Sequence, residues 1–99
     1  MAAIGQVVTL GEGVQVRPVA LLEDSRCPAL VRCIWAGRVR IEALIRFQSG
    51  SEMRREMTLG DAITLPEGNL ALSGAVPAPV AGKVIAHGAY QFTFALTPE

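Results

Sequence analysis

The residues best suited to chemistry in this chain are two cysteines and one histidine. Cys27 and Cys33 are separated by five residues, and His87 is the only histidine. These residue types suit a disulfide, two buried free thiols, half of a zinc site or a redox-active dithiol. The zinc interpretation lacks further ligands, and the spacing differs from the Cys-x-x-Cys of redox dithiols. We therefore rank a disulfide first, free thiols second, and metal or redox chemistry last.

Polar and aromatic residues flank the two cysteines. Asp24 and Arg26 precede the first cysteine, Arg26 directly. Trp35 and Gly37 follow the second cysteine. Asp24 and Arg26 suit either a recognition site or a loop held by hydrogen bonds to backbone groups, and we favour the second interpretation. Trp35 suits a ligand platform or a core position, and we expect it to be buried against the cystine, as in immunoglobulin-like sandwiches. Gly37 is expected at a bulge or a tight bend.

The sequence contains no recognisable arrangement for catalysis or for a cofactor. His87 has no acidic partner at a telling spacing, so we expect it on the surface. Gly11-Glu12-Gly13 is not followed by a predicted helix, as a phosphate-binding loop requires. None of four serines has the context of an activated nucleophile: Ser25, Ser49, Ser51 and Ser73. We therefore predict no enzymatic activity, no cofactor and no metal site.

Composition narrows the class of protein. Ninety-nine residues fit one domain, residues 1–99, and a hydrophobic fraction of 51% with 18% charge indicates a globular chain. Nine basic and nine acidic residues cancel, so no net field attracts an anionic membrane or a nucleic acid, and we predict no nucleic-acid partner. No apolar run reaches the ~18 residues of a transmembrane segment. Because the first residues lack the pattern of a signal peptide, the chain is either cytoplasmic or a mature form with an added Met1.

Strict alternation makes residues 38–48 the clearest predicted strand. Its apolar side chains fall on one face: Val39, Ile41, Ala43, Ile45 and Phe47. Ser49-Gly50-Ser51 turns the chain, and residues 52–59 return as a second strand. Only a loop with an odd number of residues keeps the apolar side chains of both strands on one face. We therefore expect a three-residue loop that pairs Phe47 with Met53.

Further short strands are expected between turn signals. They are residues 4–10, 14–22, 62–65, 70–76 and 89–96, with a return to the sheet at 33–35. Pro18, which has no backbone N–H, belongs at a sheet edge or a bulge. The last strand places four large side chains on one face, which predicts a central position in the core: Tyr90, Phe92, Phe94 and Leu96. About seven strands without an amphipathic helix predict an all-β fold, a single small antiparallel immunoglobulin-like β-sandwich, with a small β-barrel as the alternative.

The sequence around the cysteines resembles a motif of small uncharacterised bacterial proteins that are often exported or lipoprotein-like. The motif is Asp-Ser-Arg-Cys-Pro at 24–28 followed by Cys-Ile-Trp-Ala-Gly at 33–37. A Pro-x-Pro element at 77–79 and a final strand opened by Tyr90 fit the same proteins, so the similarity covers roughly residues 14–96. The resemblance implies a β-sandwich, a disulfide and an extracytoplasmic location. It implies no known activity.

Three functional hypotheses follow. We favour a non-catalytic binding or structural module, stapled by a disulfide and located in the periplasm or outside the cell, whose partner is a protein or an envelope component. The second hypothesis is an inhibitor-like or accessory subunit that inserts loop 76–88 into a partner. The third is an enzyme or a metal-binding domain that uses Cys27, Cys33 and His87. Because prolines at 18, 77 and 79 blunt two candidate sheet edges, we expect a monomer or a weak homodimer.

Overall fold

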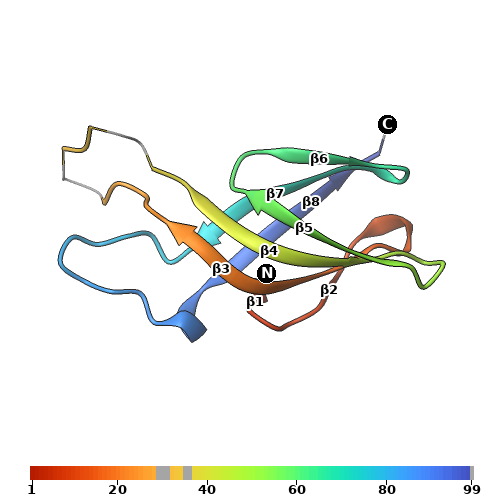
Figure 1. Cartoon of the computed structure of the whole chain (residues 1–99), viewed down its shortest axis with the longest axis horizontal. Coiled ribbons are helices and arrows are strands. Elements are labelled where there is room, and N and C mark those ends of the chain that lie inside the picture. The colour runs from red at the N-terminus through yellow and green to blue at the C-terminus, as the bar shows by residue number, and fades with distance from the viewer. Residues whose placement is uncertain (29–31, 35–36, 99) are drawn as a thin grey trace.

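Two four-stranded antiparallel sheets pack face to face (Figure 1). The computed structural model describes residues 1–28, 32–34 and 37–98, and within these residues it contains eight strands. One sheet has the order β1-β8-β7-β6 and the other the order β2-β3-β4-β5. The strand bounds are β1 Ala2–Ala3, β2 Val8–Thr9, β3 Gln15–Asp24, β4 Val39–Arg46, β5 Glu52–Thr58, β6 Ala62–Leu65, β7 Gly68–Val76 and β8 Gln91–Thr97. The predicted β-sandwich is confirmed, with eight strands in place of about seven.

The core lies between the inner faces of the two sheets. Ile41 and Ile45 from β4 are fully buried, and they belong to one cluster with Leu72 from β7 and Phe92 from β8. Each such side chain contributes about 1.5–3 kcal/mol when it leaves water. The predicted inner faces of β4 and of the last strand are therefore confirmed, because alternation along each strand directs every second side chain inward.

Pro18 lies inside a sheet and is buried. It belongs to β3, which has β2 on one side and β4 on the other, and the register of the β3–β4 pair shifts between Pro18 and Ala20. The shift is a bulge, which is where a residue without an N–H interrupts a ladder least. The predicted bulge position is confirmed.

The β4–β5 hairpin has the expected parity but a different register. Ile45 pairs with Met53 and Arg46 pairs with Glu52, so the two strands are offset by two residues from the expected register. The Phe47 N–H donates to the Ser51 carbonyl at 2.9 Å, and the Phe47 carbonyl accepts a hydrogen bond from the Gly50 N–H at 2.9 Å, so the loop consists of residues 48–50 in place of 49–51. A slip of two residues leaves the faces unchanged, so the prediction that Phe47 pairs with Met53 is wrong while the inner faces are right.

The predicted strand at 4–10 is wrong, because the N-terminal segment is divided between the two sheets. β1 pairs with β8, whereas β2 pairs with β3. The chain turns between them at Gly5, which has a φ of 87° and donates its N–H to the Pro18 carbonyl at 2.7 Å. Glycine adopts this left-handed backbone without steric cost, so the segment changes sheets there.

The predicted return to the sheet at 33–35 is wrong for the residues that the structure describes. Cys33 and Ile34 lie outside the strands, and Ile34 is 91% exposed. Trp35 lies outside the described residues, so its predicted burial against the cystine stays a prediction. Residues 83–86 also lie outside the strands, as part of a long loop that ends in the short 3-10 helix η2, His87–Ala89.

Candidate binding site at the loop end

Two long loops project from one end of the sandwich. The cystine loop, residues 25–38, joins β3 to β4, and the 77–90 loop joins β7 to β8. Figure 1 shows them as two separate arms on the left, at the end of the 45 Å long axis. We call this end of the molecule the loop end.

The cystine loop is closed by the disulfide. Cys27 and Cys33 are bonded to each other, with their Cα atoms 6.0 Å apart, so the disulfide ranked first from the spacing is confirmed. Both cysteines belong to the same loop. The bond therefore closes a local ring and does not join the two sheets, unlike the cystine of antibody domains.

Asp24 and Arg26 form a bidentate ion pair at the base of the cystine loop. Arg26 Nε lies 2.8 Å from Asp24 Oδ1, and Arg26 Nη2 lies 3.0 Å from Asp24 Oδ2. The Tyr90 hydroxyl donates to Asp24 Oδ2 at 2.7 Å. The Arg26 and Asp24 side chains are only 14% and 10% exposed, so water screens the pair weakly.

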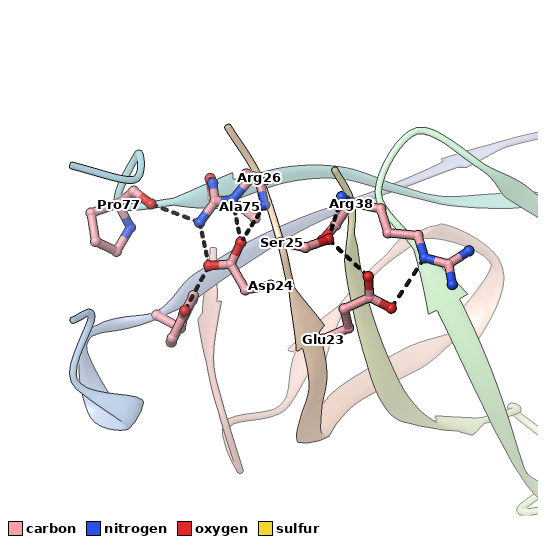
Figure 2. Close-up of polar contacts among 8 residues, drawn as sticks. Glu23, Asp24, Ser25, Arg26, Arg38, Ala75 and Pro77 are labelled. Carbon is pink, nitrogen blue, oxygen red and sulfur yellow. Dashed lines mark hydrogen bonds and ion pairs between the residues drawn. The ribbon is translucent and has the colours of Figure 1, made fainter. Parts of the chain in front are cut away.

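Arg26 also reaches the other sheet. Figure 2 shows its guanidinium pointing at two backbone carbonyls, those of Ala75 at 3.0 Å and Pro77 at 3.0 Å. These carbonyls lie at the end of β7 and at the start of the 77–90 loop. One side chain therefore ties the bases of both loops together, and it does so through hydrogen bonds to backbone groups.

The charge states at this bridge are fixed over the ordinary pH range. Hydrogen bonds from Arg26, with a smaller contribution from Tyr90, lower the pKa of Asp24 from its ordinary 3.8 to about 2. Burial, followed by the hydrogen bond to Asp24, raises the pKa of Tyr90 to about 12. Asp24 therefore stays ionised and Tyr90 stays protonated, which suits a permanent structural link and not a proton-transfer group.

A second polar network covers the outer side of the same region. Glu23 accepts hydrogen bonds from the Ser25 hydroxyl at 2.8 Å, from Arg40 Nε at 2.9 Å and from Arg38 Nε at 3.1 Å. The Ser25 hydroxyl, followed by Arg40, lowers the pKa of Glu23 to about 2. Figure 2 shows the Glu23 carboxylate turned toward Ser25 and Arg38, on the opposite side of the β3 end from Arg26.

Two hollows lie beside the bridge. The larger, of about 790 Å³, is lined by the cystine loop and the end of β3, and its lining includes both cysteines, Ile34 and Arg38. The smaller, of about 330 Å³, lies under the 77–90 loop, and its lining includes Asp24, Tyr90 and Lys83. Arg26 lines both hollows, so it forms part of the wall between them.

Apolar side chains stand exposed on both loops. Ile34 on the cystine loop is 91% exposed, and Val84 and Val80 on the 77–90 loop are 98% and 55% exposed. Singly exposed apolar residues are ordinary, and Val7 and Leu22 are exposed elsewhere; the loop end differs because it has the two most exposed large apolar side chains among the described residues, Ile34 and Val84.

The structure brings two of the predicted site residues together and places Gly37 and His87 elsewhere. Asp24 and Arg26 meet at the bridge. Gly37 has a φ of 72° and lies so close to the Ser25 carbonyl that a Cβ there would be 1.8 Å from its oxygen, so the position requires glycine, whereas the expected bulge or tight bend stays a prediction. His87 is exposed in η2 and lines neither hollow. Among the residues that the structure describes, no three His, Cys, Asp or Glu side chains are placed to hold a metal ion.

Sequence reasoning missed Tyr90 as a polar partner and Glu23 as a network centre. Tyr90 was assigned to the core from its apolar neighbours, and its ring is buried and stacked on Phe92 as expected. A buried tyrosine usually gives its hydroxyl a partner, and that rule was the available signal for the Asp24 contact. Glu23 has no comparable signal, because its two arginine partners, Arg38 and Arg40, are 15 and 17 residues away in the sequence.

Comparisons with known proteins leave the chain without an assigned family. The sequence matches no protein-family model, and neither the curated proteins nor the solved structures include a significant match. The resemblance to small exported bacterial proteins therefore stays a prediction. None of the helices among the described residues is long and apolar enough to cross a membrane.

Proposed function

We propose that this chain is a non-catalytic binding module of the bacterial envelope, which works outside the cytoplasm through its loop end. The observation that carries the proposal is the pair of exposed apolar tips, Ile34 and Val84, on two loops held at their bases by a disulfide and by Arg26. Loops displayed on a rigid sandwich are a common arrangement for recognition. Preorganised bases reduce the conformational entropy that binding would otherwise cost.

The disulfide supports the location part of this proposal. Disulfides persist in the periplasm and outside cells, and they are rare in the reducing cytoplasm. The immunoglobulin-like assignment remains part of the proposal too, supported by two packed antiparallel sheets with loops gathered at one end. A cytoplasmic location is the alternative, and it requires both cysteines to remain reduced in the cell.

Photo-crosslinking in the native cell tests the binding module. A photoreactive amino acid replaces Ile34 or Val84, and a matched control places it at Gln48, which is exposed in the β4–β5 turn at the opposite end. We expect adducts from positions 34 and 84 and none from position 48. Equal labelling at all three positions, or no adducts at the loop end, would remove the loop end as the binding site.

An inhibitor-like or accessory subunit is a second candidate, favoured by the exposure of Val84. In that case the 77–90 loop enters a partner's cleft and the cystine loop contributes little. Adducts from position 84 with none from position 34 support this candidate, whereas adducts from both positions support the two-loop module.

A further inference from the structure

Charge is segregated along the sandwich although the whole chain is neutral. The two loops of the loop end, residues 25–38 and 77–90, contain no aspartate and no glutamate. Arg32, Lys83 and His87 are exposed there, whereas Arg38 is paired with Glu23 at 3.1 Å. The acidic residues at the base of the cystine loop, Glu23 and Asp24, are already paired with arginines. Arg32 and Lys83 therefore give the two loops positive charge, while the β5–β6 turn behind them, at the same end of the sheets, carries Asp61.

Acidic residues predominate in the turns at the opposite end. β3 and β7 both run toward the loop end, so the segments that precede them lie at the far end of the sheets. Those segments carry Glu12 and Glu67, and the β4–β5 turn at the same end is flanked by the oppositely charged residues Arg46 and Glu52. A molecule with this polarity turns its loop end toward a negatively charged surface.

The apolar tips lie on the same end as the cations. Ile34 follows Arg32 by two positions, and Val84 follows Lys83 directly. Exposed apolar side chains with neighbouring Lys and Arg are the combination with which peripheral proteins enter a membrane interface: the cations meet lipid phosphates and the apolar groups leave water.

We propose that the loop end docks on an anionic lipid surface, with Ile34 and Val84 inserted among the headgroups and Lys83 and Arg32 against the phosphates. This inference rests on the proposed binding module and names its partner. Tight docking onto a protein would need a surface shaped to fill the hollows of about 790 and 330 Å³ beside the two arms. A fluid lipid surface accommodates two separate tips without such a match.

The fold limits the depth of insertion. Loop backbone groups need hydrogen-bond partners, so the tips reach the headgroup region and not the hydrocarbon interior. Pro77 and Pro79 lower the number of N–H groups that need partners. Because the disulfide and Arg26 hold the loop bases, insertion of the tips requires no rearrangement of the sheets.

Vesicle co-sedimentation tests the proposal directly. The intact, oxidised protein is mixed with phosphatidylcholine vesicles, either pure or containing about one third phosphatidylglycerol. We expect binding to the anionic vesicles alone, and a marked loss of binding when ionic strength is raised from about 0.05 to 0.5 M. No binding to anionic vesicles at low salt would overturn the inference.

Three variants separate the apolar contribution from the charge contribution. Ile34→Ser/Val84→Ser removes both apolar tips without changing charge, and we expect affinity for anionic vesicles to fall by at least about tenfold. Lys83→Glu reverses one charge and is expected to weaken binding by about tenfold. Arg55→Glu makes the same charge change on an exposed residue of β5, away from the loops, and its affinity should stay within about twofold of the parent.

The outcomes distinguish this inference from the proposed function. Vesicle binding that survives Ile34→Ser/Val84→Ser, or that Arg55→Glu weakens as much as Lys83→Glu does, overturns tip insertion. Protein adducts at positions 34 and 84 without vesicle binding overturn the lipid partner and leave the binding module standing. Absence of both adducts and vesicle binding removes both proposals. Since the substituted side chains are exposed, unchanged melting temperatures show that the variants remain folded.

Discussion

Arg26 donates hydrogen bonds to three residues with a side chain that is only 14% exposed. Its acceptors are a carboxylate on its own strand end and two carbonyls from the other sheet. A lysine at this position carries a single nitrogen and would leave some of these acceptors without a donor. The guanidinium is therefore a specific requirement of the bridge between the loops.

The contribution of the Asp24 carboxylate to stability can be measured by varying the pH. Asp24→Asn should lower the free energy of unfolding by about 2 kcal/mol at neutral pH, because the Arg26 guanidinium loses its charged partner. The folded pKa of Asp24 is depressed to about 2, so its contribution is complete above the ordinary value of 3.8 and disappears as pH falls toward 2. Urea unfolding of both proteins from pH 7 to 2 measures this: the gap between them should close at the acid end.

A gap that is constant across the whole pH range would show that the ion pair contributes nothing and that the Asn side chain disturbs the loop in another way. Tyr90→Phe is the matched control. It removes the hydroxyl donor to Asp24 and keeps the ring, so a smaller loss of about 1 kcal/mol is expected.

Gly37 offers a second test at the residue scale. Gly37→Ala should destabilise the fold by more than about 3 kcal/mol, because it combines a left-handed backbone with a Cβ placed 1.8 Å from the Ser25 carbonyl oxygen. Gly82→Ala is the control, since Gly82 has a similar φ of 75° and no atom within 4 Å of the added Cβ. Thermal melting of both variants is the measurement, and equal losses would contradict the close approach at Gly37.

Part of the candidate site could be predicted from local sequence. Asp24 and Arg26 were identified as residues that hold the loop through backbone hydrogen bonds, since short polar side chains near a turn commonly do so. Their distant acceptors were not predictable in this way. The Ala75 and Pro77 carbonyls are 49 and 51 residues from Arg26, and every residue type offers the same carbonyl group. Long-range contacts to the backbone leave no trace in side-chain pattern.

At the scale of the elements, the cystine loop depends on its covalent closure. Cys27→Ser/Cys33→Ser should lower the free energy of unfolding by about 2 kcal/mol, the chain-entropy value for so short a ring. We also expect amide hydrogen exchange to increase first within the described residues of 25–38, with β4 and β8 unaffected. Exchange that increases evenly over both sheets would show that the disulfide supports the whole sandwich and not its loop.

A charged side chain on the edge strand β5, that of Arg55, protects the sheet against self-association. Arg55 lies on the same face of β5 as Met53 and Met57, which point inward, and its cross-strand partner Ala43 is buried. Arg55 itself is nevertheless exposed. A charged residue at a core-facing position of an edge strand discourages another chain from adding to the sheet. This device fits the expected monomer or weak homodimer.

Removal of that charge should expose the edge. Arg55→Leu is expected to produce concentration-dependent self-association that sedimentation velocity detects, whereas Arg55→Glu keeps a charge and stays like the parent. Identical sedimentation of the parent and Arg55→Leu at every concentration would show that other features of β5 protect the edge.

Predictability of the strands followed the strength of their alternation. β4 and β8 alternate without a break in their apolar faces, and both were located to within two residues. The prediction for the N-terminal segment was wrong because β1 pairs in one sheet and β2 in the other, and Ile4 and Leu10 pack on the core from outside the strands. The break at Gly5 depends on which strands lie nearby, and that information is not local.

At the scale of the whole molecule, the sum of the charges conceals their distribution. The net charge of zero argued against attraction to an anionic membrane, but a sum treats Glu12 and Lys83 as if they cancelled. They lie at opposite ends of a molecule that is 45 Å long, several times the screening length of about 8 Å at physiological salt. Each end therefore interacts with its surroundings according to its own sign.

The pairing of the first strand with the last has a consequence for biosynthesis. Ala2 of β1 pairs with Phe92 of β8, so the sheet that contains them closes only after nearly the whole chain has left the ribosome. Contacts between such distant residues form slowly because loop closure costs entropy first. A chain that ends before β8 lacks Phe92 and Phe94 and should remain unfolded in circular dichroism. This late closure is compatible with the proposed extracytoplasmic location, because passage through a secretion channel requires an unfolded chain.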